Sequence, residues 1–239
     1  MDSMLKGIWK AGILELKSAG EVAAFLLLLA GMIGLGYFLS EKMGNPLRWV
    51  GVNRFCLLAA LIVLSIPVTI QMQSKELQKI AASPHGIVSL ELAKTSEKAE
   101  AIRAAWKATY LPIDIDNEKV KKVNALEQAK KEIYFDAPFL VLYSLFFMLV
   151  MFWIAEHHTG RVQSVALTLG WAAPIAGVFD AVENYAMLQI LNEDSATWFA
   201  PLAFWCALLK LFLTLVVFGV FLIVVFGMFL RAVGPRPPA

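Results

Sequence analysis

Charged residues are scarce in this chain. They make up 17% of its 239 residues, whereas hydrophobic residues make up 59%. Soluble domains carry about 25% charged residues, so this balance is typical of an integral membrane protein. The formal net charge is +2, and it gives no indication of a nucleic-acid partner.

Cysteine and histidine are also rare, with two and three copies. Cys56 and Cys206 form no CxxC motif and are expected near opposite membrane faces, which excludes a disulfide between them and makes thiol–disulfide redox chemistry a poor fit. Three histidines are too few for the histidine boxes of membrane desaturases. The chain has no ExxH, HExxH or GxSxG motif, so di-iron, zincin and serine-hydrolase sites are not indicated. We therefore predict no metal site and no cofactor.

The sequence does contain several long apolar runs. A transmembrane helix needs about 20 mostly apolar residues. On this basis we predict an all-α, polytopic integral membrane protein. Its five hydrophobic spans are expected at residues 21–39, 55–70, 136–155, 162–188 and 201–230. The first span offers almost no polar side chains, so the other four are expected to form a four-helix core to which it is added.

The remaining segments are polar. Residues 1–20 have the pattern of an amphipathic helix lying in the membrane interface, and the Pro-rich tail 234–239 is expected to be disordered. Residues 71–135 form a mixed-charge extramembrane insert that we expect to be helical. Ser83–Pro84 predicts the start of one helix, Thr95 or Ser96 predicts the start of a second, and Asn117 predicts the start of a third that runs into the next span.

The charge pattern of the connections predicts an orientation. With five spans, the insert and the acidic loop at residues 189–200 share one side of the membrane. Arg161, Arg231 and Arg236 lie on the other side. The positive-inside rule then places the C-terminus in the cytoplasm and the insert outside, although the lysines before residue 20 favour the reverse.

Two carboxylates and an amide interrupt the apolar run of residues 162–188: Asp180, Glu183 and Asn184. Residues three and four apart share a helical face. An ionised group deep in a bilayer costs about 2.5–3.5 kcal/mol, so it usually faces protein or a wet cavity. At about 1.5 Å per residue, Lys210 lies about 15 Å and Asp180 about 12 Å from the same membrane face. These depths predict that Lys210 pairs with Asp180 or Glu183.

Other polar residues are expected at the same depth. Asp136 and Tyr143 share one face of the third span, and Glu91 lies on the insert beside apolar residues. We therefore predict a cavity that opens toward the insert, with the Trp106 helix as its cover. Its predicted lining is Glu91, Asp136, Tyr143, Asp180, Glu183, Asn184 and Lys210. A structural alternative stays open, in which these groups only hold the helices together and Asp136 caps its helix.

One ordered set of residues resembles an uncharacterised family of small bacterial inner-membrane proteins: Gly86-Ile87-Val88-x-x-Glu91-Leu92-Ala93, Trp106, Asp136, Tyr143, Asp180-x-x-Glu183-Asn184 and Lys210. The likeness covers roughly residues 55–230. It implies a four-helix core and a multi-pass location in the bacterial inner membrane. It supplies no activity.

Three functional hypotheses follow. The first is a protein that binds a small cation, a proton or a lipid headgroup, or assists its transport. The second is an intramembrane enzyme on a lipid-like substrate, with Asp180 or Glu183 as general base and Lys210 or Tyr143 as electrophilic aid. The third is a structural subunit of a membrane assembly. The lipid bilayer is the expected partner, and a second copy or another membrane protein is left open.

Overall fold

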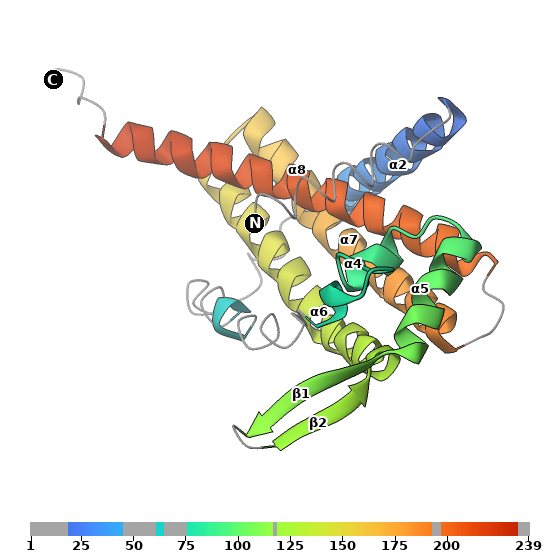
Figure 1. The fold of residues 1–239 in the computed structure, drawn as a ribbon. Coiled ribbons are helices and arrows are strands. Elements are labelled where there is room, and N and C mark those ends of the chain that lie inside the picture. The colour runs from blue at the N-terminus through green and yellow to red at the C-terminus, as the bar shows by residue number, and fades with distance from the viewer. Residues whose placement is uncertain (1–18, 45–60, 65–75, 117–118, 193–196, 234–239) are drawn as a thin grey trace, which may run out of the picture.

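The computed structural model describes residues 19–44, 61–64, 76–116, 119–192 and 197–233. The predicted interfacial helix and the tail lie almost wholly outside these ranges. The described residues are mostly helical (Figure 1). The elements are α2 (Ala19–Met43), η2 (Leu77–Lys79), α4 (Ile87–Glu91), α5 (Ser96–Ala108), β1 (Tyr110–Asp116), β2 (Lys119–Asn124), α6 (Ala125–His157), α7 (Arg161–Asn192) and α8 (Phe199–Val233).

Three of these helices, α6, α7 and α8, are long and apolar enough to cross a membrane. They have 33, 32 and 35 residues, and they contain the third, fourth and fifth predicted spans. The predicted count of five is not supported. The first span was expected at residues 21–39, where the structure has the helix α2. This helix is not one of the three that are long and apolar enough to cross a membrane. Of the second span, only residues 61–64 are described, and they are helical.

The insert gathers at one end of the bundle, where α6 begins, α7 ends and α8 begins (Figure 1). One hydrophobic core unites the insert with those three helix ends. Its largest buried side chain is Trp106, whose indole Nε1 donates a 2.7 Å hydrogen bond to Ser83 Oγ. The insert is therefore packed onto the long helices, and Trp106 belongs to its core rather than to the cover of a cavity.

Of the helix starts predicted in the insert, the one at Thr95 is confirmed and the one at Ser83–Pro84 is wrong. Thr95 caps α5 as expected, accepting a hydrogen bond from the backbone N–H of Lys98. The expected helix from Ser83–Pro84 is instead the short α4, which begins only after Gly86. Gly86 has φ of +62°, a left-handed conformation that suits glycine and interrupts a helix. The Ser83 hydroxyl donates to the carbonyl oxygen of Leu77 and so does not cap a helix.

The prediction that a helix begins at Asn117 is wrong, because residues 119–124 form a strand. Residues 110–116 and 119–124 form the antiparallel strands β1 and β2, in which Tyr110 lies opposite Asn124. The sequence explains the difference, because Ile113 and Ile115 alternate with Asp114 and Asp116 in a period of two. α6 starts only after the hairpin, where the Asn124 side chain accepts a hydrogen bond from the backbone N–H of Leu126.

α2 approaches α7 closely through one glycine. A Cβ atom at Gly36 would lie 2.7 Å from the carbonyl oxygen of Thr168 and 3.3 Å from Cβ of Ala172. The Trp171 indole Nε1 also donates a 3.0 Å hydrogen bond to the carbonyl oxygen of Gly44. Small residues permit such close contact between membrane helices.

We expect Gly36→Ala to force α2 and α7 apart, because the added methyl group meets backbone atoms that no rotamer change can move. Overpacking of this kind costs about 1–3 kcal/mol. Thermal unfolding in detergent measures the loss. Gly34→Ala, on the same helix with nothing within 4 Å of the added atom, is the control and should leave the melting temperature unchanged or raised. Equal melting of the two variants would contradict the contact.

Candidate functional site

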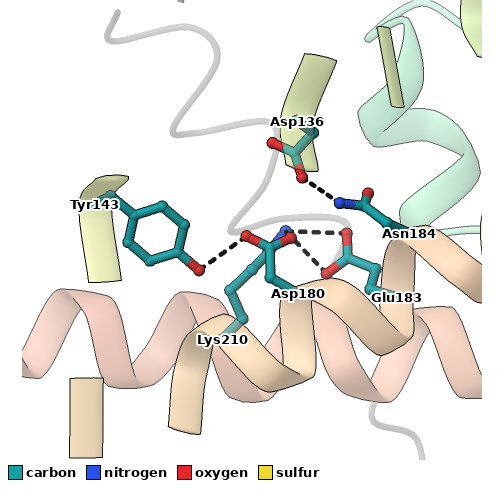
Figure 2. A network of polar contacts seen from close by, with 6 residues as sticks. All are labelled: Asp136, Tyr143, Asp180, Glu183, Asn184 and Lys210. Atoms are coloured by element: carbon teal, nitrogen blue, oxygen red, sulfur yellow. Dashed lines mark hydrogen bonds and ion pairs between the residues drawn. The ribbon is translucent and has the colours of Figure 1, made fainter. Parts of the chain in front are cut away.

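Six of the seven predicted site residues meet in one polar cluster formed by α6, α7 and α8 (Figure 2). We call it the polar cluster. Its members are Asp136, Tyr143, Asp180, Glu183, Asn184 and Lys210. Asp180, Glu183 and Asn184 lie on one face of α7, as their spacing predicts, and that face is buried against the neighbouring helices.

Lys210 of α8 makes the central contacts. Its ammonium Nζ donates to Asp180 Oδ1 at 2.8 Å and to Glu183 Oε1 at 3.0 Å, and it lies 2.8 Å from Glu183 Oε2. The predicted pairing is therefore confirmed with both carboxylates rather than one. The side chains of Asp180 and Glu183 are 3% and 0% exposed, whereas that of Lys210 is 20% exposed. The pairing lowers the free-energy cost of burying these charges.

α6 contributes a donor and an acceptor. The Tyr143 hydroxyl donates a 2.8 Å hydrogen bond to Asp180 Oδ2, so Asp180 accepts from both α6 and α8. One turn further along α7, the Asn184 amide Nδ2 donates to Asp136 Oδ2 (Figure 2). Asp136 lies within α6 and not at its first residues. The expected capping role is therefore wrong, because α6 begins eleven residues earlier, at Ala125.

Glu91 brings the insert to the polar cluster. It is the last residue of α4, a helix that packs on α8 through Val88 and Leu92. Burial raises the pKa of Glu91, the positive charge of Lys210 opposes that effect, and the negative charge of Asp180 adds to it. Glu91 therefore lies within electrostatic range of Lys210, Asp180 and Asp136.

The charges of this site do not balance. Four carboxyl groups, those of Glu91, Asp136, Asp180 and Glu183, act on one another and on Lys210. Among the described residues, these contacts include a single cation. An unpaired buried charge costs several kcal/mol. Among the described residues, the site therefore carries a surplus of negative charge, which bound protons would reduce.

The predicted carboxylate-lined cavity stays a prediction. The carboxyl groups are packed against their donors, and the cavity that the structure shows beside them has a volume of about 250 Å³ and an apolar lining. Tyr143 is the one predicted site residue in that lining, which otherwise comes from Leu61, Ile62, Phe139, Leu142, Phe146 and Phe147. Tyr143 thus separates an apolar cavity from the polar cluster.

Two buried polar groups beside the site were not predicted. Glu132 is 5% exposed and lies one helical turn before Asp136, and it accepts a hydrogen bond from Gln128. Ser144 follows Tyr143, packs against Gly177 and has a hydroxyl with no hydrogen-bond partner among the described residues. The four-residue spacing from Asp136 could have revealed Glu132. In the region described, no group of three or more His, Cys, Asp or Glu residues is arranged to hold a metal ion.

No protein-family model, curated protein or solved structure matches this chain. The function therefore has to be inferred from the polar cluster, its charges and its contacts with the insert.

Removal of the central cation is expected to destabilise the protein strongly. Lys210→Met leaves Asp180 and Glu183 buried without a counter-charge, which costs about 3–5 kcal/mol of unfolding free energy. Thermal unfolding in detergent measures the loss. Lys79→Met is the matched control, because it breaks an ion pair whose lysine side chain is 67% exposed. Such a surface pair contributes about 0.2–1 kcal/mol.

A triple variant separates charge from packing in this experiment. Adding Asp180→Asn and Glu183→Gln to Lys210→Met removes the unpaired charges and should restore part of the lost stability. A triple variant no more stable than Lys210→Met alone would contradict the electrostatic explanation.

The raised pKa of Glu91 predicts a pH dependence of stability. The folded state binds this proton more tightly than the unfolded chain, in which the glutamate pKa is about 4.3. The contribution of Glu91 to stability is therefore fully present below that value and is lost as the pH rises through its folded-state pKa. The difference in unfolding free energy between the wild type and Glu91→Gln should therefore change with pH. The wild type should lose stability relative to the variant as the pH rises through this interval. A difference that stays constant with pH would contradict the prediction.

Proposed function

We propose that this chain is a multi-pass membrane protein whose polar cluster binds protons, and that it works as a proton-binding or transport-assisting protein. The observation that carries the proposal is the ratio of four carboxyl groups to one ammonium group. Such a site holds its full negative charge only at a large cost in free energy, so it takes up positive charge readily. Ionisable residues inside membrane helices commonly mark proton and ion pathways.

The mutual effect of the carboxyl groups favours a proton. Neighbouring carboxyl groups repel one another while they are ionised, and a proton bound by one of them removes that repulsion. The remaining groups form a connected series, from Glu183 through Lys210 and Asp180 to Tyr143. A proton bound at one carboxyl therefore changes the charge that its neighbours experience.

The proposed location is the bacterial inner membrane, with the C-terminus in the cytoplasm. The resemblance of the ordered polar residues supports the bacterial membrane. The arginines support the orientation, because Arg161 at the start of α7 and Arg231 near the end of α8 fall at the opposite end of these helices from the insert. Cytoplasmic segments usually hold the excess of Arg and Lys.

Charge displacement tests the proposal. The purified full-length protein is reconstituted in liposomes on a solid-supported membrane, and the external pH is changed rapidly. We expect a transient current from proton binding in the wild type and a smaller one in Glu183→Gln and in Asp180→Asn. Glu100→Gln, on the exposed side of α5, is the control and should retain the wild-type current.

The other hypotheses predict different results in the same preparation. A current driven by a jump in sodium or potassium concentration, and not by pH, would indicate a small-cation site. A co-purified lipid that changes with time, and that stays unchanged in Asp180→Asn, would indicate the enzyme. No current in any variant, combined with lower melting temperatures for Glu183→Gln and Asp180→Asn, would support the structural role and contradict the proposal.

A further inference from the structure

Three exposed aromatic side chains with polar tips lie at the insert end of the long helices. Tyr134 of α6 is 62% exposed, Tyr185 of α7 is 54% exposed, and Trp198, which directly precedes α8, is 58% exposed. All other tyrosines and tryptophans within α6, α7 and α8 are at least partly buried. We call Tyr134, Tyr185 and Trp198 the aromatic belt. Tyrosine and tryptophan are enriched where a membrane protein meets the lipid headgroups, because the ring is apolar and its O–H or N–H group is polar.

Contacts between the helices hold the aromatic belt at one height along the bundle. Tyr185 directly follows Asn184, whose side-chain amide donates to Asp136, and Asp136 lies two residues after the belt tyrosine of α6. The Tyr185 ring centroid lies 6.2 Å from that of Phe199, and the Phe199 ring centroid lies 4.1 Å from that of Trp198. The three belt side chains therefore lie at one level, as the headgroup region of a flat bilayer requires.

Beyond the aromatic belt, the helices carry no charged residue outside the polar cluster over a length that can cross a bilayer. The charge-free segments are residues 135–155 of α6, 162–184 of α7 and 199–230 of α8 once the polar cluster is set aside. At about 1.5 Å per residue they are about 32, 34 and 48 Å long, and the hydrocarbon core of a bilayer is about 30 Å thick. The charged side chains of the polar cluster contact residues of neighbouring helices (Figure 2).

The aromatic belt lies much closer to the polar cluster than the far end of the helices does. Along α7, Asp180 lies about 8 Å from Tyr185 and about 28 Å from Arg161, at about 1.5 Å per residue. Glu183 lies nearer still to Tyr185. The midplane of a hydrocarbon core about 30 Å thick, measured from the belt, is about 15 Å away. Both carboxylates therefore lie on the insert side of that midplane.

We propose that the aromatic belt binds the headgroup region of membrane phospholipids and holds the polar cluster within the insert-side half of the bilayer. The rings contact the first methylene groups of the acyl chains, while the phenol O–H and indole N–H groups donate to phosphate or ester oxygen atoms of the lipid. The solution that bathes the insert is then the one nearest to the polar cluster. This inference rests on the membrane location given in the proposed function, and it is independent of proton binding.

Depth measurements with nitroxide spin labels test this position. The full-length protein with Cys56→Ser and Cys206→Ser is reconstituted in liposomes of phosphatidylcholine and phosphatidylglycerol and is labelled at one introduced cysteine at a time. The depth of each label follows from its collision rates with O₂, which concentrates in the bilayer, and with a water-soluble nickel chelate. We expect Tyr134→Cys, Tyr185→Cys and Trp198→Cys to place their labels at the headgroup level.

Two controls on other surfaces calibrate the depth scale. Val178→Cys, at a 63% exposed position of α7, should place its label about 10 Å deeper than Tyr185→Cys, at about 1.5 Å per residue. Glu100→Cys, on the exposed side of α5, should be fully accessible to the nickel chelate. The melting temperature of each labelled variant shows that it is folded.

The native Trp198 side chain gives a second measurement that needs no label. The difference in fluorescence between the wild type and Trp198→Phe isolates the emission of this tryptophan. Lipids brominated near the headgroup should quench that emission by about twofold or more relative to lipids brominated near the chain end, because the indole ring lies at the headgroup level.

Two results would overturn the inference in distinguishable ways. Belt labels as accessible to the nickel chelate as Glu100→Cys, or as deep as Val178→Cys, would refute the position of the aromatic belt and leave the proposed function in place. Full accessibility of every label, Val178→Cys included, would show that α7 lies outside the membrane and would overturn the proposed function as well.

Discussion

The ion pairs of Lys210 with Asp180 and Glu183 are the constraint on which the rest of this structure depends. They join α8 to α7 at a depth where unpaired charges are costly, and the Tyr143 hydroxyl extends the contact to α6. Apolar side chains alone associate weakly in a bilayer, because lipid tails are as apolar as they are. The polar contacts therefore specify the relative register of the three helices, while close-packed residues such as Gly170 and Gly177 allow the approach.

Among the described residues, the same contacts leave a surplus of negative charge, and the proposed function rests on this surplus. One ammonium group cannot neutralise four carboxyl groups, and the hydrogen-bond donors Tyr143 and Asn184 carry no charge. If the groups served stability alone, a balanced pair would suffice. The insert adds to the imbalance, because α4 brings Glu91 within electrostatic range of Asp180 and Lys210. The insert is packed onto the long helices by the hydrophobic core around Trp106.

Much of the site could be predicted from sequence because helical geometry is regular. The spacing of Asp180, Glu183 and Asn184 defines one face, and a constant rise per residue places Lys210 at the depth of Asp180. Bounds between elements were harder to predict. Gly86 adopts a left-handed conformation that delays the start of the expected helix, and residues 110–116 and 119–124 form strands within a segment that was predicted to be helical.

The sequence by itself determined the membrane character, the long apolar helices and the residues of the polar cluster, since these depend on composition and local periodicity. Only the tertiary structure decided that Lys210 contacts both carboxylates, that Tyr143 donates to Asp180, and that α4 packs on α8. Those features depend on the rotation of each helix about its axis and on the docking of α4. Both are set by contacts between residues far apart in the chain, which no local pattern encodes.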